Sequence, residues 1–191
     1  MKVGVLALQG DVREHLAALE SAGATALEVK HADTLAGVDA LVLPGGESTT
    51  IGKLLDRFQL LDPLRERAAS GMPTYGSCAG LILMAKEIVG DHPAPHRLDL
   101  LDVVVKRNAY GRQVDSFEAD LEVQGLEEGF RAVFIRAPEV EGTGEDVEVL
   151  ATWEGRPVLV RQGHLLASSF HPELTGDPRV HQLFVEAIEK S

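Results

Sequence analysis

The chain has 191 residues, 45% of them hydrophobic and 25% charged, as expected for one globular domain with a sizeable core. Its formal net charge of −12, which no basic run offsets, excludes nucleic acids and anionic membrane surfaces as expected partners. No apolar run approaches the roughly 18 to 20 residues that span a bilayer, and the N-terminus resembles a strand more than a signal peptide. A single cysteine forms no internal disulfide or zinc site, so we expect a cytoplasmic protein without metal or cofactor.

The first half of the chain alternates predicted strands and helices. Continuous apolar runs, typical of strands buried on both faces, indicate strands at residues 3–8, 26–29, 40–43 and 74–75. Asp11 is expected to cap the first helix in a capping box with Glu14, and Gly23 to end it. Ser48 is expected to cap the next helix. The apolar positions of that helix, which predict one buried face, are Ile51, Leu54, Leu55 and Phe58.

A further helix is predicted at residues 61–69, and the second half is then richer in strands. These strands are expected at residues 101–106, 114–123, 132–135, 147–152, 158–160 and 165–170. Gly163 falls in a hairpin turn, and the last helix is expected to be capped by Asp177 with Pro178 at its first position. The pattern predicts an α/β fold: one domain over residues 1–191, with a mixed, mostly parallel sheet flanked by helices.

The only cysteine lies in a motif that is typical of a nucleophile. Residues 76–80 read Gly-Ser-Cys-Ala-Gly, a sharp strand-to-helix turn in which side chains at the two glycine positions would clash. The turn places Cys78 at a helix N-terminus, where free N–H groups and the helix dipole favour a thiolate. A buried core cysteine is the alternative, and the flanking glycines argue against it.

A candidate base follows the last predicted core strand. His171 stands at the carboxyl end of that strand, and parallel strands bring their carboxyl ends, Cys78 included, to the same edge of the sheet. In an extended segment Glu173 would face the same way as His171 and could orient its ring. The other histidines carry no predicted role, and we expect His15 and His181 at the surface.

The glycine-rich segment after the third strand is not a phosphate loop. Five residues separate Gly46 from Gly52 where a P-loop has four, and Glu47 would repel a phosphate. A backbone N–H at Gly45-Gly46, together with the N–H of Ala79, is better suited to stabilise an oxyanion beside the cysteine.

Several segments together resemble the class I (triad) glutamine amidotransferases, whose fold is flavodoxin-like. Within them, the chain closely resembles the family of glutaminase subunits of pyridoxal 5′-phosphate synthases. The segments that carry this resemblance, between residues 6 and 181, are LALQGDVREH, LPGGESTTIGKLL, YGSCAGLILMA, KRNAYGRQVDSFE, FIRAPEV and SFHPELTGDPRVH.

The resemblance implies a reaction, a substrate pocket and a partner. Cys78 would attack the side-chain amide of L-glutamine to form a thioester, with His171 as base and acid and Glu173 as its orienter. Ammonia would pass to a separate synthase (lyase) subunit that builds the pyridine ring. The implied glutamine-binding residues are Gly46, Glu47, Ser48, Arg107, Ile135 and Arg136. An arginine suits this pocket because a guanidinium binds a carboxylate bidentately.

Two alternatives of different class stay open from the sequence. One is another triad enzyme, either a glutaminase that feeds a different synthase or a related γ-glutamyl hydrolase. The other is a non-catalytic flavodoxin-like binding module, in which Cys78 would have no function. The segment around Arg107 favours the vitamin B6 branch.

Overall fold

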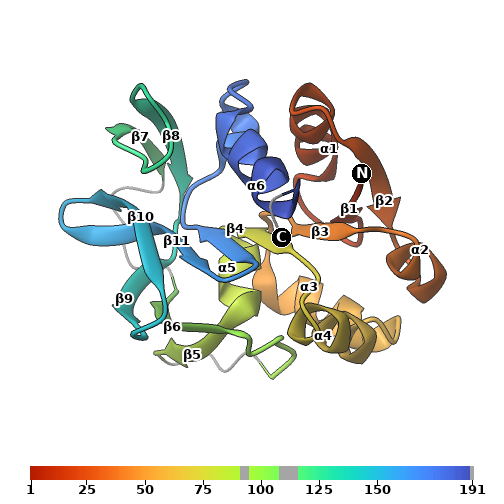
Figure 1. The fold of residues 1–191 in the computed structure, drawn as a ribbon. Coiled ribbons are helices and arrows are strands. Elements are labelled where there is room, and N and C mark those ends of the chain that lie inside the picture. Colours follow the sequence, from red (N-terminus) through yellow and green to blue (C-terminus); the bar gives the residue numbers. More distant parts are fainter. Residues whose placement is uncertain (91–94, 108–115, 190–191) are drawn as a thin grey trace.

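The computed structural model describes residues 1–90, 95–107 and 116–189, and it confirms the predicted fold class (Figure 1). The helices are α1 (Val12–Ser21), α2 (Ala32–Ala36), α3 (Ser48–Arg57), α4 (Leu61–Ala69), α5 (Ala79–Met84), the 3-10 helix η1 (Pro172–Leu174) and α6 (Arg179–Glu189). The strands are β1 (Lys2–Leu6), β2 (Thr25–Val29), β3 (Ala40–Leu43), β4 (Thr74–Ser77), β5 (Ala85–Val89), β6 (Leu101–Lys106), β7 (Ser116–Leu121), β8 (Phe130–Ile135), β9 (Glu139–Thr143), β10 (Glu148–Trp153), β11 (Arg156–Gln162) and β12 (Leu165–Ser168).

The largest sheet has seven strands in the order β10-β11-β12-β4-β3-β1-β2. The five strands from β12 to β2 are parallel, whereas β10 and β11 are antiparallel additions at one edge. Smaller sheets are formed by β5-β6-β9 and by β7-β8. The order in which the strands were added to the sheet changes direction at β1: β2 lies on one side of β1, and β3 lies on the other. Ligands of open α/β sheets bind beside such a reversal.

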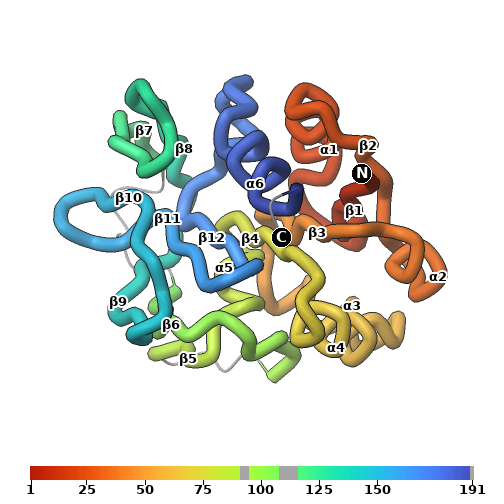
Figure 2. The backbone as a smooth tube through the Cα atoms, viewed as in Figure 1, coloured from red at the N-terminus to blue at the C-terminus, as the bar shows by residue number. Residues whose placement is uncertain are grey.

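The two faces of the central sheet are covered by different helices. Along β3, Ala40 and Val42 pack into one core and Leu41 and Leu43 into the other, as the two-residue period of a strand requires. Helices α1 and α6 lie side by side over the first face, and α3, α4 and α5 lie against the second (Figures 1 and 2).

The ends of two helices differ from the prediction. The Asp11 side chain makes no capping hydrogen bond to α1, so the predicted capping box is wrong. Glu47, not Ser48, caps α3, because its carboxylate accepts hydrogen bonds from the backbone N–H groups of Thr49 and Thr50. Phe58 follows the end of α3 and is 48% exposed, so it is not part of the predicted buried face.

Strand β6 has the predicted bounds, whereas α2 and β5 in the first half of the chain and β9 in the second were not predicted. The predicted strand at 165–170 ends at Ser168, and Pro178 stands just before α6, where Asp177 accepts a hydrogen bond from Arg179 N–H. Residues 108–115, which hold most of the KRNAYGRQVDSFE segment and the start of the strand predicted at 114–123, lie outside the described residues. No helix among the described residues is long and apolar enough to cross a membrane.

Candidate active site

Four loops meet at the carboxyl ends of the parallel strands. They follow β1, β3, β4 and β12, and they carry Asp11, Gly45, Cys78 and His171 respectively. The loops after β1 and β3 are joined by a hydrogen bond of 3.1 Å from Asp11 N–H to the carbonyl oxygen of Gly45. The sequence prediction that Cys78 and His171 share one edge of the sheet is therefore confirmed.

The backbone of Cys78 has the strained geometry of a nucleophile elbow. Its φ of 46° and ψ of −97° are rare for a residue with a side chain. A Cβ on Gly76 would lie 2.6 Å from the carbonyl carbon of Gly80, and one on Gly80 would lie 2.3 Å from the carbonyl oxygen of Leu43. The two glycines thus permit the close contact that the turn needs, as the motif predicts. Cys78 opens α5 and is 7% exposed.

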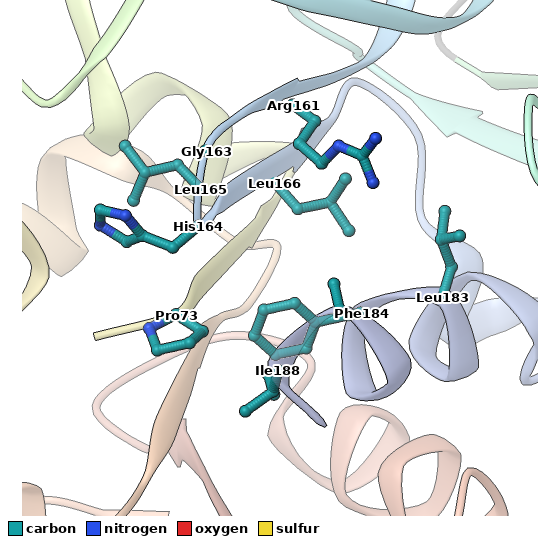
Figure 3. A pocket seen from close by; sticks show the side chains of 10 residues that line it. Pro73, Arg161, Gly163, His164, Leu165, Leu166, Leu183, Phe184 and Ile188 are labelled. Carbon is teal, nitrogen blue, oxygen red and sulfur yellow. The ribbon is translucent and has the colours of Figure 1, made fainter. Parts of the chain in front are cut away.

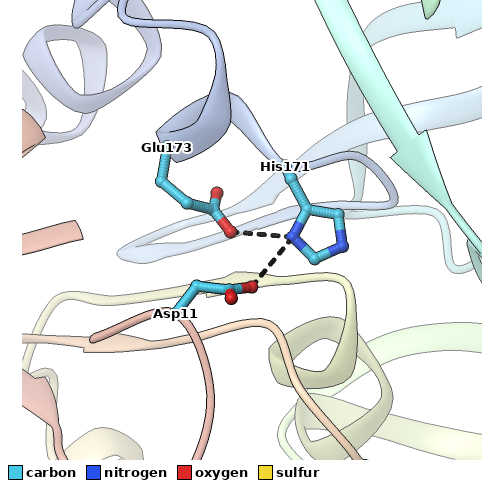
Figure 4. A group of neighbouring side chains, drawn as sticks. All are labelled: Asp11, His171 and Glu173. Atoms are coloured by element: carbon cyan, nitrogen blue, oxygen red, sulfur yellow. Dashed lines mark hydrogen bonds and ion pairs between the residues drawn. The ribbon is translucent and has the colours of Figure 1, made fainter. Parts of the chain in front are cut away.

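Two carboxylates, those of Glu173 and Asp11, face the same ring nitrogen of His171 (Figure 4). Its Nδ1 is 2.8 Å from Glu173 Oε1 and 3.4 Å from Asp11 Oδ2. Burial of His171 lowers its pKa, but hydrogen bonds to Asp11, Cys78 and Glu173 outweigh burial and raise the pKa to about 12. The surroundings of His171 therefore favour an imidazolium, which can stabilise a thiolate on Cys78 and donate a proton to a leaving group.

Glu173 reaches His171 by a different backbone route from the predicted one. Residues 172–174 form a 3-10 turn instead of an extended segment, yet the carboxylate still meets the imidazole. The side chain of Glu173 is fully buried. Burial raises the pKa of Glu173, but the hydrogen bonds from His15 and His171, with the charge of His171, outweigh burial and hold the pKa well below its usual range.

Gly45 leaves room for the ring of His171. A Cβ at this position would lie 2.4 Å from His171 Cε1 and 2.9 Å from Asp11 Oδ2. Gly46 has a φ of 155°, and a Cβ there would lie 2.6 Å from the side-chain oxygen of Gln9. Close packing against His171 thus requires a glycine at position 45, and the positive φ favours one at position 46. The predicted oxyanion role of Gly46 and Ala79 remains a prediction.

A cavity of about 400 Å³ opens in front of Cys78 and His171. All the residues that the sequence assigned to the substrate line it: Gly46, Glu47, Ser48, Arg107, Ile135 and Arg136. The Cys78 thiol lies 3.9 Å from the carbonyl oxygen of Ile135 and donates to it. Arg136, like Cys78, has a positive φ, of 43°.

Glu47 and Arg107 form an ion pair on the wall of this cavity. Arg107 Nη2 lies 3.3 Å from Glu47 Oε1. Burial raises the pKa of Glu47, but the hydrogen bonds from Thr50 and Thr49 outweigh burial and lower the pKa to about 2. At neutral pH the wall therefore presents an anion and a cation side by side, which complement the ammonium and carboxylate groups of a free amino acid.

A second hollow lies at the amino ends of the central strands, between α6 and the starts of β4 and β12 (Figure 3). Its walls include Pro73, His164, Leu165, Phe184 and Ile188. It contains none of the predicted site residues.

Three residues near the triad were misjudged from the sequence. Asp11 was expected to cap a helix, and its carboxylate instead faces His171. His15 and His181 were expected at the surface, and both are fully buried behind Glu173. The helical spacing contained a signal for both: His15 lies four residues before buried Leu19, and His181 lies three before Phe184. Residue type alone had suggested a surface position for both histidines.

Asp11, His171 and Glu173 each place one ligand-type atom within 4.8 Å of the other two, a spacing that suits a metal ion. Two of these atoms, Nδ1 of His171 and Oε1 of Glu173, already face each other at hydrogen-bond distance. The contact between His171 and Glu173 thus accounts for two of the three ligand-type atoms.

Comparison with known proteins agrees with this geometry. A profile of the SNO glutamine amidotransferase family matches residues 5–190. The chain belongs to this family. It is 61% identical to the pyridoxal 5′-phosphate synthase subunit PdxT of Mycobacteroides abscessus, over 97% of this chain and 96% of that protein. It is also 61% identical to the subunit of the same name from Frankia casuarinae, over 100% of this chain and 96% of that protein.

Solved structures lead to the same fold. A crystal structure of a glutamine amidotransferase superposes with a TM-score of 0.93, at 56% identity, over 98% of both chains. A putative GMP synthase component from Thermoplasma acidophilum superposes with a TM-score of 0.69 over 100% of this chain and 94% of that one. Its identity of 16% supports the shared fold alone.

Proposed function

We propose that this chain hydrolyses L-glutamine to L-glutamate and ammonia, and that it supplies the ammonia to the synthase subunit of a pyridoxal 5′-phosphate synthase. The arrangement that carries the proposal is Cys78 beside His171, backed by Glu173, in a cavity that the predicted substrate residues also line. The synthase partner rests on the names of the relatives that share about 60% of the sequence.

In the first half of the reaction, the Cys78 sulfur attacks the amide carbon of glutamine, and the C=O bond becomes a C–O⁻ single bond. The N–H groups of Gly46 and Ala79 are the proposed donors to this oxyanion. His171 donates its proton to the amide nitrogen, the C–N bond breaks, and ammonia leaves behind a thioester. Glu173 stabilises the imidazolium before that proton transfer.

In the second half, neutral His171 accepts a proton from water as the water oxygen attacks the thioester carbon. The C–S bond then breaks, and L-glutamate and the thiolate are released. In the same proposal Arg107 binds the α-carboxylate and Glu47 the α-ammonium, while Ser48, Ile135 and Arg136 complete the pocket. The ion pair between Arg107 and Glu47 separates when glutamine binds. Two new ion pairs replace it, one from Arg107 to the α-carboxylate and one from Glu47 to the α-ammonium.

The experiment measures glutamate production by the wild type and by Cys78→Ala, each with and without a synthase subunit from a relative. We expect ammonia release by the wild type with the synthase and a loss of about 10⁴-fold or more in Cys78→Ala. A glutamine-derived chloroketone should label Cys78. Equal activity of the variant, or no labelling in the presence of the synthase, would contradict the enzyme assignment. Stimulation by an imidazole-glycerol-phosphate cyclase instead would contradict the vitamin B6 assignment.

A further inference from the structure

Behind Glu173, on the side away from the cavity, a chain of polar side chains continues into the core. His15 Nε2 lies 3.4 Å from Glu173 Oε1 and 2.9 Å from Ser77 Oγ. On its other side, His15 Nδ1 lies 2.9 Å from Nε2 of His181. His15, His181 and the side chain of Glu173 are all fully buried. Such groups are costly to bury unless they are hydrogen-bonded, so their placement calls for an explanation.

One ring nitrogen without a hydrogen-bond partner determines where the protons of the His15 and His181 rings lie. No described residue gives Nδ1 of His181 a hydrogen-bond partner. A proton on that nitrogen would be a buried donor without an acceptor, whereas a lone pair there costs less. The proton of neutral His181 is therefore on Nε2, from which it is donated to Nδ1 of His15. Burial, together with the neighbouring ring of His15, lowers the pKa of His181 to about 3, in agreement with a neutral ring.

This assignment fixes the tautomer of His15 as well. Because Nδ1 of His15 accepts the proton of His181, the proton of neutral His15 is on Nε2. That N–H is directed at Ser77 Oγ and Glu173 Oε1, and Ser77 Oγ in turn donates to Glu173 Oε1 at 3.5 Å. The N–H groups of His181 and His15 thus both point along the hydrogen-bonded series toward the carboxylate of Glu173.

The two histidine rings are held from the side by one aromatic residue. The ring of Tyr75 packs edge-on against His15 at 6.2 Å and against His181 at 5.8 Å between centroids. The Tyr75 hydroxyl is itself fixed by Ser168 Oγ at 2.8 Å. His15 comes from α1 and His181 from the first turn of α6, so the chain also links the two helices that cover this face of the sheet.

We propose that His15, oriented by His181, is a positioning residue that holds the Glu173 carboxylate against Nδ1 of His171. The triad then continues into the core as Cys78–His171–Glu173–His15–His181. This inference rests on the proposed function for its effect on turnover. Its effect on the reactivity of the Cys78 thiol does not depend on the substrate.

The test uses two polar variants that differ in where they place a donor. The side-chain amide of His15→Gln reaches the position of Nε2, toward Glu173, whereas that of His15→Asn ends near Nδ1, toward His181. In the complex with the synthase, we expect kcat of His15→Asn to fall about 10- to 100-fold, by analogy with the hydrogen-bond partners that orient metal ligands, with little change in KM. His15→Gln should stay within a few-fold of the wild type.

The second readout is the pH dependence of Cys78 alkylation by iodoacetamide in the free subunit. A weaker hold on Glu173 weakens the His171 imidazolium, so the midpoint for His15→Asn should lie about one pH unit above that of the wild type. His181→Leu should shift it less in the same direction. His164→Gln removes a histidine that binds the Ala68 carbonyl at the far edge of the sheet, and should leave it unchanged.

Equal kcat values and equal alkylation profiles for the His15→Gln and His15→Asn variants would overturn the proposal. A wild type that releases no ammonia with the synthase would instead contradict the proposed function, and the alkylation profiles would still decide the role of His15. Thermal melts of each variant check that the comparison is between folded proteins.

Discussion

The two sides of the His171–Glu173 pair differ in their access to water. Toward the cavity, Asp11 faces His171 with a side chain that is 36% exposed, whereas His15 and His181 behind Glu173 are fully buried. Water weakens the interaction between charges, so the contact of His171 with Asp11 is expected to contribute less than its contact with the fully buried side chain of Glu173. We therefore expect Asp11 to change the properties of His171 only slightly, and the buried Glu173 to determine its position and charge.

The largest effect is expected where the buried charge itself is removed. Glu173→Gln keeps the shape of the side chain and removes the anion beside His171. Because the imidazolium loses its stabilising charge, kcat should fall by about 10³- to 10⁴-fold. The measurement is glutamate release in the complex with the synthase. A loss below tenfold would show that the buried carboxylate does not control the histidine.

The next effect is a displacement of the base without any change of charge. The Cβ of Gly45→Ala would overlap the ring of His171, so the ring must move, and we expect kcat to fall about 100-fold. Gly37→Ala is the control, because its nearest neighbours would lie at 3.6 Å or beyond. If both variants keep wild-type turnover, the contact between Gly45 and His171 does not position the base.

A smaller effect is expected on the cavity side. Asp11→Asn removes the second carboxylate near Nδ1 of His171, and the rate of Cys78 alkylation at neutral pH should fall less than tenfold. The difference from the wild type should shrink toward 1 M salt, where the Debye length is about 3 Å. A large, salt-independent loss would mean that Asp11 and Glu173 are equivalent partners of the base.

The smallest effect concerns stability. Glu47 caps α3, and Glu47→Ala should lower the free energy of unfolding at pH 7 by about 0.5–1 kcal/mol. Its folded pKa of about 2 lies below the usual 4.5, so the charge of Glu47 stabilises the fold above pH 4.5, and this contribution is lost as the pH falls toward 2. Urea unfolding should thus show a difference between wild type and variant that narrows between these pH values. A constant difference would exclude the carboxylate charge as its source.

The sequence predicted what depends on local pattern. Apolar runs located β3 and β6 to the residue, and the glycines around Cys78 predicted its strained turn. It did not predict which other side chains pack around His171 and Glu173, since nothing local distinguishes an Asp11 that caps a helix from one that faces His171. Likewise, whether His15 is buried depends on α6, which lies more than 160 residues further along the chain.

Strand β12 determines when the proposed catalytic centre can first form during synthesis. Leu165–Ser168 inserts between β11 and β4, and its parallel register with Thr74–Ser77 sets His171 beside Cys78. Nascent chains grow from the N-terminus at about 5 to 20 residues per second. In a nascent chain Cys78, the proposed nucleophile, is therefore translated well before His171, the proposed base. If the proposed function is right, glutamine hydrolysis requires the strand of the central sheet that is translated last.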